Sequence, residues 1–181
     1  MRRLAFIVII MATQSHTAWA VVDVEVLAGR GAAVAAEAGG PKTSAADLTS
    51  ASLHIAPLPL VPVAIGAAVT NRKYVTTFGG HEEHVTRWTA GPEIMMWIPG
   101  FALSPYLKVS TSVVSKFTAT SSDEVRPAQT SSPTYPGSQE TLFGGGLKWS
   151  PVPVFALLGE YRQNIRDSSQ RTVLLGLGAE I

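Results

Sequence analysis

The chain contains no cysteine, which excludes disulfide frameworks, thiolate metal sites and cysteine nucleophiles. Charged residues make up only 15% of its 181 residues and the formal net charge is +1, so nothing in the composition points to a nucleic-acid partner. Beyond the first twenty residues there is no apolar run near the roughly 20 residues that a membrane-spanning helix needs. Any role inside a membrane must therefore use β-strands.

The start of the chain, "MRRLAFIVIIMA", has two arginines followed by a short apolar run. The polar stretch after it ends in "AWA", the small-x-small pattern of a cleavage site, at Ala20. We therefore predict a signal peptide over 1–20 and one β-barrel domain over 21–181. The alternative is an uncleaved anchor, and no cysteine follows the site to support lipoprotein processing.

Sixteen glycines and twelve prolines are scattered among short apolar runs, which favours strands joined by turns over helices. In "FALLGEYR" (155–162), for example, the two residue parities differ in character, as expected when side chains leave a strand on alternate faces. This pattern predicts eight strands at roughly 21–36, 44–57, 61–75, 85–98, 104–118, 140–150, 153–165 and 170–181.

The predicted connections fall into two alternating classes. Three are short, apolar and contain proline, at 56–62, 98–105 and 150–153. Four are polar, at 37–44, 77–84, 119–139 and 166–170. Alternation of this kind predicts an antiparallel up-and-down meander whose two termini lie at the short-turn end. Pro92 falls inside the fourth predicted strand, where its missing N–H predicts a bulge or local break.

Alternation alone does not decide which way the apolar residues face. A soluble barrel of the lipocalin type points them inward, whereas a membrane barrel points them outward to lipid. The second arrangement is favoured because the opposite parity is small as well as polar, which suits the narrow bore of eight strands. Its small members are Ser50, Ser52, Ala64, Gly66, Ala68, Ser110, Ser112, Gly144, Gly146, Gly176 and Gly178.

The apolar parity also carries no charge in mid-strand, where Lys or Arg costs about 2–4 kcal/mol at a bilayer midplane. Its members include Val22, Val24, Val26, Ala28, Ala51, Leu53, Ile55, Val63, Ile65, Ala67, Val69, Val173, Leu175, Leu177, Ala179 and Ile181.

Aromatic residues of this parity gather near the strand ends. Two belts of aromatic residues are typical of membrane interfaces, and the alternative is that these are ordinary core residues. They are Trp88, Phe117, Phe143 and Tyr161 toward the polar loops, and Trp149 and Phe155 toward the short turns.

Strands, short turns and longer polar loops in this arrangement resemble the small eight-stranded outer-membrane β-barrels of the OmpA transmembrane-domain and OmpX-like type. The resemblance implies an all-β fold, an eight-stranded antiparallel up-and-down transmembrane β-barrel with short periplasmic turns and longer extracellular loops in a bacterial outer membrane. It also implies contact with outer-membrane lipid and lipopolysaccharide, insertion by the barrel-assembly machinery, a monomer, and roles such as envelope integrity, adhesion or stress resistance. The chain departs from the pattern at its end, "LLGLGAEI", where Ile181 replaces the usual terminal aromatic residue.

The inward parity holds most of the charges in equal numbers of each sign, together with His54. The acids are Asp23, Glu25, Glu93, Glu160 and Glu180, and the bases are Arg72, Lys108, Lys116, Lys148 and Arg162. Balanced charges in a narrow bore can pair and plug it, which predicts a structural network, with a narrow or gated channel for small solutes and a ligand site as the alternatives. A turn centred near residues 100–101 would place Glu93 opposite Lys108, and we predict that these two come within salt-bridge distance.

No catalytic, cofactor-binding or metal-binding residue is predicted. "HEEH" (81–84) offers zinc-type ligands, but its histidines are three apart in an expected loop, whereas the zinc-protease motif needs them four apart on a helix. A lipid-modifying enzyme could use His54 with the nearby Ser50 and Ser52, yet no nucleophile motif surrounds them. The loop 119–139 is the longest connection and the expected place for surface recognition. A soluble periplasmic barrel that binds apolar ligands is the remaining alternative.

Overall fold

A computed structural model describes most of the chain after the predicted signal peptide, and residues 1–20 lie outside the described part. The described residues are 21–37, 40–57, 61–78, 81–99, 102–121, 140–152, 154–165 and 170–181. No helix among them is long and apolar enough to cross a membrane.

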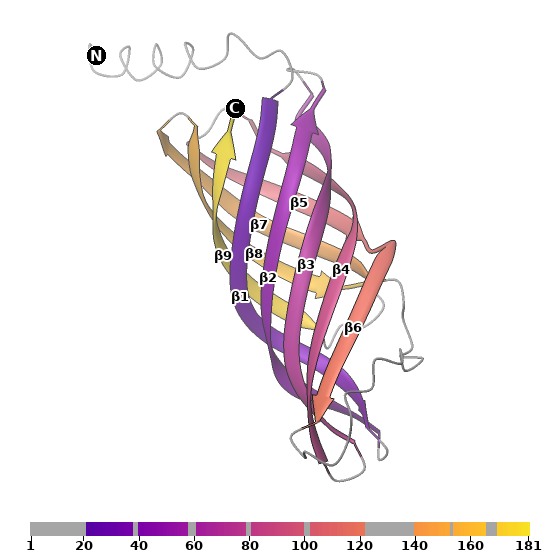
Figure 1. Ribbon diagram of the computed structural model, residues 1–181. Helices are drawn as coiled ribbons and strands as arrows, with labels where there is room; N and C mark the ends of the chain where they lie inside the picture. The colour runs from indigo at the N-terminus through magenta and orange to yellow at the C-terminus, as the bar shows by residue number, and fades with distance from the viewer. Residues whose placement is uncertain are drawn as a thin grey trace, which may run out of the picture.

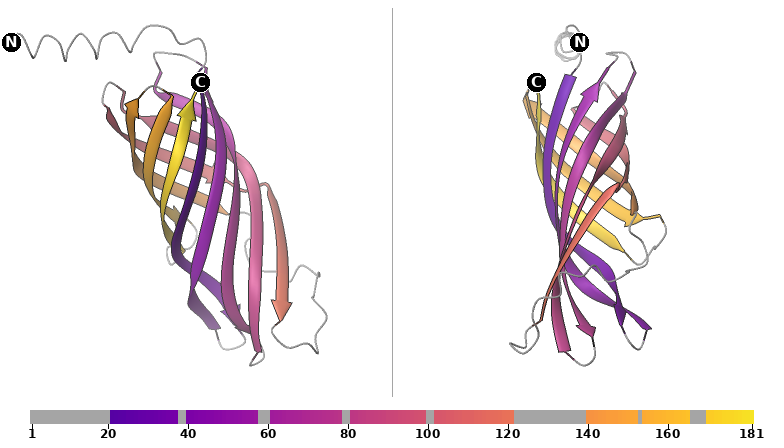
Figure 2. Two further views of the ribbon diagram at one scale, coloured as in Figure 1. Left: turned by 60° about the vertical axis from the view of Figure 1, so that its left-hand side comes forward. Right: turned by 45° about the vertical axis from the view of Figure 1, so that its right-hand side comes forward.

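The structure is a closed antiparallel β-barrel (Figures 1 and 2). Its strands are β1 (Val21–Glu37), β2 (Gly40–Ala56), β3 (Val63–Phe78), β4 (His81–Trp97), β5 (Leu103–Thr111), β6 (Val114–Ser121), β7 (Thr141–Val152), β8 (Phe155–Asn164) and β9 (Arg171–Glu180). The sheet order is β3-β2-β1-β9-β8-β7-β5-β4-β6, and pairing of β3 with β4 closes it. Because β5 and β6 pair with successive parts of β4, they form one interrupted strand. The prediction of an eight-stranded up-and-down barrel is therefore confirmed.

The two ends of the barrel differ. Val22 and Ile181 exchange backbone hydrogen bonds of 2.9 and 2.8 Å, so the first and last strands meet at one end, here called the terminal end (Figure 1). The other end, here called the loop end, is extended by β1 to β4 and β6, which project beyond β7 to β9 (Figure 2). Pairing of β1 with β2 continues to Glu37 and Gly40, whereas pairing of β1 with β9 stops at Gly31.

This extension corrects two predicted loops. Most of 37–44 and of 77–84 belongs to strands, and only residues 38–39 and 79–80 separate the paired segments. Antiparallel pairing satisfies the backbone N–H and C=O groups of these segments. A polar sequence does not prevent this pairing, because the backbone groups form it. The "HEEH" segment consequently begins β4 rather than lying in a loop.

The predicted break at Pro92 is found in the ladder on one edge of β4. β4 pairs with β6 over Glu83–Ala90 and with β5 over Glu93–Trp97, and the interruption lies opposite Gly91 and Pro92. Pro92 has no N–H to donate, and the partner chain bulges there, so that Val113 N donates to Ala90 O at 2.9 Å. The bulge leaves Val113 and the adjacent Val114 both exposed, which changes the parity between β5 and β6.

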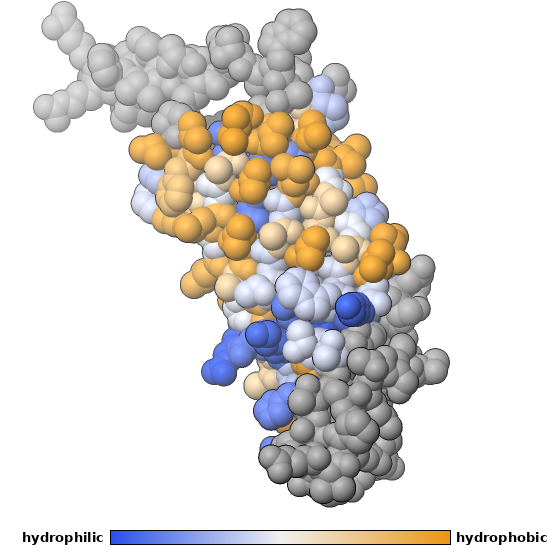
Figure 3. Space-filling view, viewed as in Figure 1, coloured by the Kyte–Doolittle hydropathy of each residue, from blue (hydrophilic) through white to orange (hydrophobic). Residues whose placement is uncertain are grey.

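The distribution of side chains is the inverse of that in a soluble protein. Leu175, Leu177 and Ile65 are 70%, 52% and 57% exposed, whereas Glu160 and Arg162 are each 3% exposed. Figure 3 shows the exposed apolar residues gathered in a belt toward the terminal end, with polar side chains beyond it. The orientation predicted from residue parity is thus confirmed.

Candidate functional site

The bore of the barrel is the part of the described structure where charged side chains gather. They lie in three layers along the axis, here called the terminal-end, middle and loop-end layers. Each layer is built from inward-facing positions of several strands, because every second residue of a strand points into the bore.

The terminal-end layer consists of Asp23 from β1, Lys148 from β7 and Glu180 from β9. Lys148 Nζ lies 2.6 Å from Asp23 Oδ2 and 2.7 Å from Glu180 Oε1, so one ammonium joins two carboxylates. Asp23 and Lys148 are buried, whereas the side chain of Glu180 is 40% exposed.

The middle layer is centred on Lys108 of β5, which is 2% exposed. Its ammonium donates to Glu25 of β1 and lies 3.3 Å from Glu160 Oε2 and 3.9 Å from Glu93 Oε1. These carboxylates come from three different strands, so Lys108 ties opposite sides of the bore together. The prediction that Glu93 and Lys108 reach salt-bridge distance is confirmed.

Their exact register was predicted wrongly. Lys108 pairs directly with Met95, and Glu93 pairs with Ser110, so the two charged residues are diagonal neighbours on one face. The observed pairing differs from the predicted one by two residues, which changes the residue opposite each charge. Both charges still face the bore, because side chains alternate between the two faces with period two.

The remaining members of the middle layer complete the network. Arg162 donates through Nε to Glu160 and through Nη1 to Ser50 Oγ at 3.0 Å. Tyr106 donates its hydroxyl proton to Glu160 Oε2 at 2.9 Å. His54 Nε2 lies 2.8 Å from Glu93 Oε1. Glu160 thus accepts from three donors, if the nearby Lys108 is included.

The loop-end layer is organised around Glu140, which immediately precedes β7. Arg72 Nη1 donates to Glu140 Oε1 at 3.1 Å and to Gln170 Oε1 at 2.9 Å, and Arg87 Nη1 also donates to Glu140 Oε1. The Glu140 backbone N–H donates to Ser112 Oγ at 2.7 Å, at the bulge of the interrupted strand. The bulge therefore helps to hold the acid that pairs both arginines.

One predicted inward charge is wrong, and two inward charges were missed. Lys116 is exposed and pairs with the outward-facing Trp88, because the bulge at residues 112–113 shifts the parity of β6. Arg87, on the inward parity next to Trp88, and Glu140, one residue before β7, are both buried. The bore among the described residues therefore has six acids and five bases instead of five of each. The acids are Asp23, Glu25, Glu93, Glu140, Glu160 and Glu180, and the bases are Arg72, Arg87, Lys108, Lys148 and Arg162.

The Ser and His residues considered for lipid chemistry are engaged in other contacts. His54 bonds Glu93 through Nε2, and its Nδ1 has no hydrogen-bond partner. Ser52 donates to Glu25 at 3.4 Å, and Ser50 accepts from Arg162. The arrangement gives neither hydroxyl a histidine base.

The other predicted features have mixed outcomes. Trp88, Phe143, Tyr161, Trp149 and Phe155 are all exposed on the outer surface, as the two aromatic belts require. The side chain of Phe117 lies outside those described, as do residues 122–139 of the long loop. In "HEEH", Glu82 and His84 are exposed, whereas nothing is described of the other two side chains.

Comparisons with known proteins identify the fold. The sequence matches no family model and no curated protein. The solved structure of Ail, the attachment invasion locus protein of Yersinia pestis, in complex with the heparin analogue sucrose octasulfate, matches with a TM-score of 0.58 at 12% identity and covers 91% of this chain and 100% of Ail. Neisserial surface protein A matches with a TM-score of 0.50 at 14% identity and covers 91% of this chain and 97% of its own.

These neighbours are small outer-membrane barrels, and the chain has their fold: a transmembrane-type β-barrel of eight antiparallel strands. Eight antiparallel strands in a closed barrel are the fold that the resemblance of the sequence pattern implied.

Proposed function

We propose that this is a bacterial outer-membrane protein, exported by residues 1–20, with a structural or surface-directed role and no catalytic activity. One observation carries the proposal: large apolar side chains are exposed on the outside of the closed barrel, and buried ion pairs lie inside it. A continuous apolar belt is a liability in water but is solvated by lipid, and a closed barrel leaves no unpaired strand edge within the membrane.

Cell fractionation tests the location most simply. We expect the expressed protein in the outer-membrane fraction, starting at Val21 by N-terminal sequencing, and with a gel mobility that changes on heating. Recovery of folded protein in the soluble fraction without detergent would instead favour a soluble barrel that binds apolar ligands.

The ionic network supports a bore that is closed to solutes. Its contacts join strands on different sides of the barrel, such as Lys108 of β5 to Glu25 of β1 and Arg72 of β3 to Glu140. A cavity of about 10 Å³ lined by Thr70, Thr89 and Glu140, among others, has room for about one water molecule. We expect refolded protein in planar bilayers to show no reproducible conductance steps, and such steps would favour a narrow or gated channel.

The loop end supports a surface-directed role. The projecting strands carry the chain beyond the apolar belt (Figure 2). Exposed basic side chains lie on the outer surface toward the loop end, on β1, β3, β6 and β9: Arg30, which pairs with Asp47, and Lys73, Lys116 and Arg171. Lysine and arginine are suited to the phosphate groups of lipopolysaccharide. Ail was solved with a sulfated sugar, which is consistent with an anionic saccharide as the ligand class for this surface.

Binding of purified lipopolysaccharide to the barrel tests this contact. The double variant Lys73→Glu with Arg171→Glu reverses two exposed charges without touching the bore. We expect it to fold normally and to bind lipopolysaccharide at least tenfold more weakly. Unchanged binding would remove these side chains from the proposed contact.

A further inference from the structure

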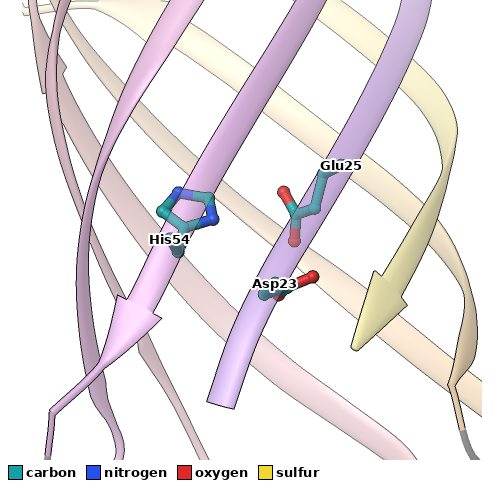
Figure 4. A group of neighbouring side chains, drawn as sticks. All are labelled: Asp23, Glu25 and His54. Atoms are coloured by element: carbon teal, nitrogen blue, oxygen red, sulfur yellow. The ribbon is translucent and has the colours of Figure 1, made fainter. Parts of the chain in front are cut away.

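Three buried side chains, Asp23 of the terminal-end layer with Glu25 and His54 of the middle layer, have the donor set and the spacing of a metal site. Asp23 and Glu25 are two residues apart on β1, so both point inward, and His54 on β2 is the direct partner of Asp23. One potential ligand atom from each lies within 4.8 Å of the others. Figure 4 shows the carboxylate of Glu25 and the imidazole of His54 facing one another from neighbouring strands, with Asp23 beside them on β1.

Each of these side chains has one buried atom without a hydrogen-bond partner: Asp23 Oδ1, Glu25 Oε1 and His54 Nδ1. The residues are only 4%, 0% and 0% exposed. Buried polar atoms are nearly always satisfied, so three such atoms in one group point to a missing partner that accepts electron pairs from all of them.

In each of these side chains, the other oxygen or ring nitrogen makes a contact, and this contact orients the unpartnered atom. Glu93 is a carboxylate that only accepts, so His54 Nε2 is the donor in their 2.8 Å bond, and in the neutral imidazole Nδ1 is then a lone pair. A carboxylate behind a histidine is the usual support of a metal-bound imidazole. Asp23 Oδ2 and Glu25 Oε2 are held by Lys148 and Lys108.

The local charge also favours a cation. In the terminal-end and middle layers, the described residues include five carboxylates and three basic side chains, an excess of two negative charges when His54 is neutral. The carboxylates belong to Asp23, Glu25, Glu93, Glu160 and Glu180, and the cations are Lys108, Lys148 and Arg162. A divalent cation neutralises this excess, which offsets its repulsion by the two lysines.

We propose that Asp23, Glu25 and His54 bind a divalent first-row transition cation, with Zn²⁺ as the probe. Zinc bonds of about 2.0–2.2 Å in a tetrahedron hold ligand atoms roughly 3.3–3.6 Å apart, so small side-chain rotations close the group around the ion. One imidazole and two carboxylates suit zinc, and they leave a fourth position for water. The cation reaches the site from the terminal end, past the partly exposed Glu180. The metal cross-links β1 and β2 inside the closed bore.

The test uses mature protein without an affinity tag, refolded in detergent micelles, treated with a chelator and titrated with Zn²⁺. Bound metal is measured by elemental analysis after gel filtration and by calorimetry. We expect one Zn²⁺ per chain, and Asp23→Asn or His54→Gln to weaken binding by about 100-fold or more. Glu93→Gln, which removes the carboxylate behind the imidazole and one negative charge near Lys108 and Arg162, should weaken it by about 10–100-fold.

The matched control is the double variant His81→Ala with His84→Ala, which removes the two other histidines after residue 20. It should keep the full affinity of wild type. Absence of retained Zn²⁺ in wild type, or its loss in this control while His54→Gln still binds, would overturn the proposal.

If His54→Gln does not fold, wild type alone decides. Long-range proton–nitrogen NMR of the histidine rings should show a large shift of His54 Nδ1 on adding Zn²⁺, while Nε2 remains protonated. An unchanged His54 signal would mean that the three atoms face only water, and the site would be rejected. This result would leave the proposed membrane location untouched, because that location is tested by fractionation.

Discussion

Replacement of Lys108 by methionine tests whether the bore network stabilises the fold. Methionine keeps much of the apolar stem and removes the charge that Glu25, Glu93 and Glu160 share. Because Lys108 is 2% exposed, water cannot replace the lost ammonium without opening the bore. The carboxylates would remain buried with a smaller positive charge among them.

Removal of one partner from a buried ion pair typically costs about 3–5 kcal/mol. This corresponds to a change of roughly two to three and a half powers of ten in the unfolding equilibrium. The assay is reversible denaturant unfolding of refolded protein in lipid vesicles, followed by tryptophan fluorescence and by heat-sensitive gel mobility. Lys73→Met, at an exposed outer position, is the matched control and should change stability by no more than about 0.5 kcal/mol.

Glu25→Gln in the Lys108→Met background removes one of the carboxylates left by the first change. It should recover part of the lost stability, since the two residues are in direct contact and are expected to couple. A Lys108→Met barrel within about 1 kcal/mol of wild type would show that the network does not stabilise the fold, because the pair would then behave like one at a surface.

Three further substitutions probe other parts of the barrel by the same unfolding assay. Leu175→Arg places a charge on the lipid face and should cost about 2–4 kcal/mol in vesicles; no cost would contradict a lipid-facing position. Val154 has a φ of 80°, so Val154→Gly should relieve strain and add about 1 kcal/mol, and a loss would show that the strain is absent. A Cβ on Gly66 would lie 2.0 Å from Leu53 O, whereas one on Gly159 would lie 3.7 Å from Leu175 Cδ2. Gly66→Ala should therefore lose roughly 2 kcal/mol or more, and Gly159→Ala should be tolerated; equal effects would count against this packing.

Residue parity predicted the fold and most of the bore, because strand period two assigns each side chain to a face whatever the exact pairing. Asp23, Glu25, Glu93, Glu160 and others were placed correctly on this basis. Lys116 failed because one bulged residue reverses the parity downstream of it, and Pro92 predicted only that a break exists, not that it lies in the partner strand. Glu140 was missed because it lies at the edge of a strand.

Contacts across the bore could not be predicted from the pattern. They depend on the stagger of strands around the closed barrel, which brings together Lys108 and Glu25, 83 residues apart. The unpartnered atoms of Asp23, Glu25 and His54 depend in turn on those contacts. The other polar atom of each side chain contacts Lys148, Lys108 and Glu93, respectively. The sequence therefore indicated which charged residues face the bore, and only the structure showed which of them are in contact.

The central claim is that hydrocarbon surrounds the barrel, and the absence of cysteine allows a direct test with single-cysteine labels. A fluorophore on Leu175→Cys is compared with one on Lys73→Cys in vesicles that contain quencher lipids labelled at mid-chain. We predict strong quenching by lipid at position 175, and at position 73 weak lipid quenching with ready quenching by aqueous iodide. Iodide quenching at position 175 with no effect of the quencher lipids would contradict the central claim.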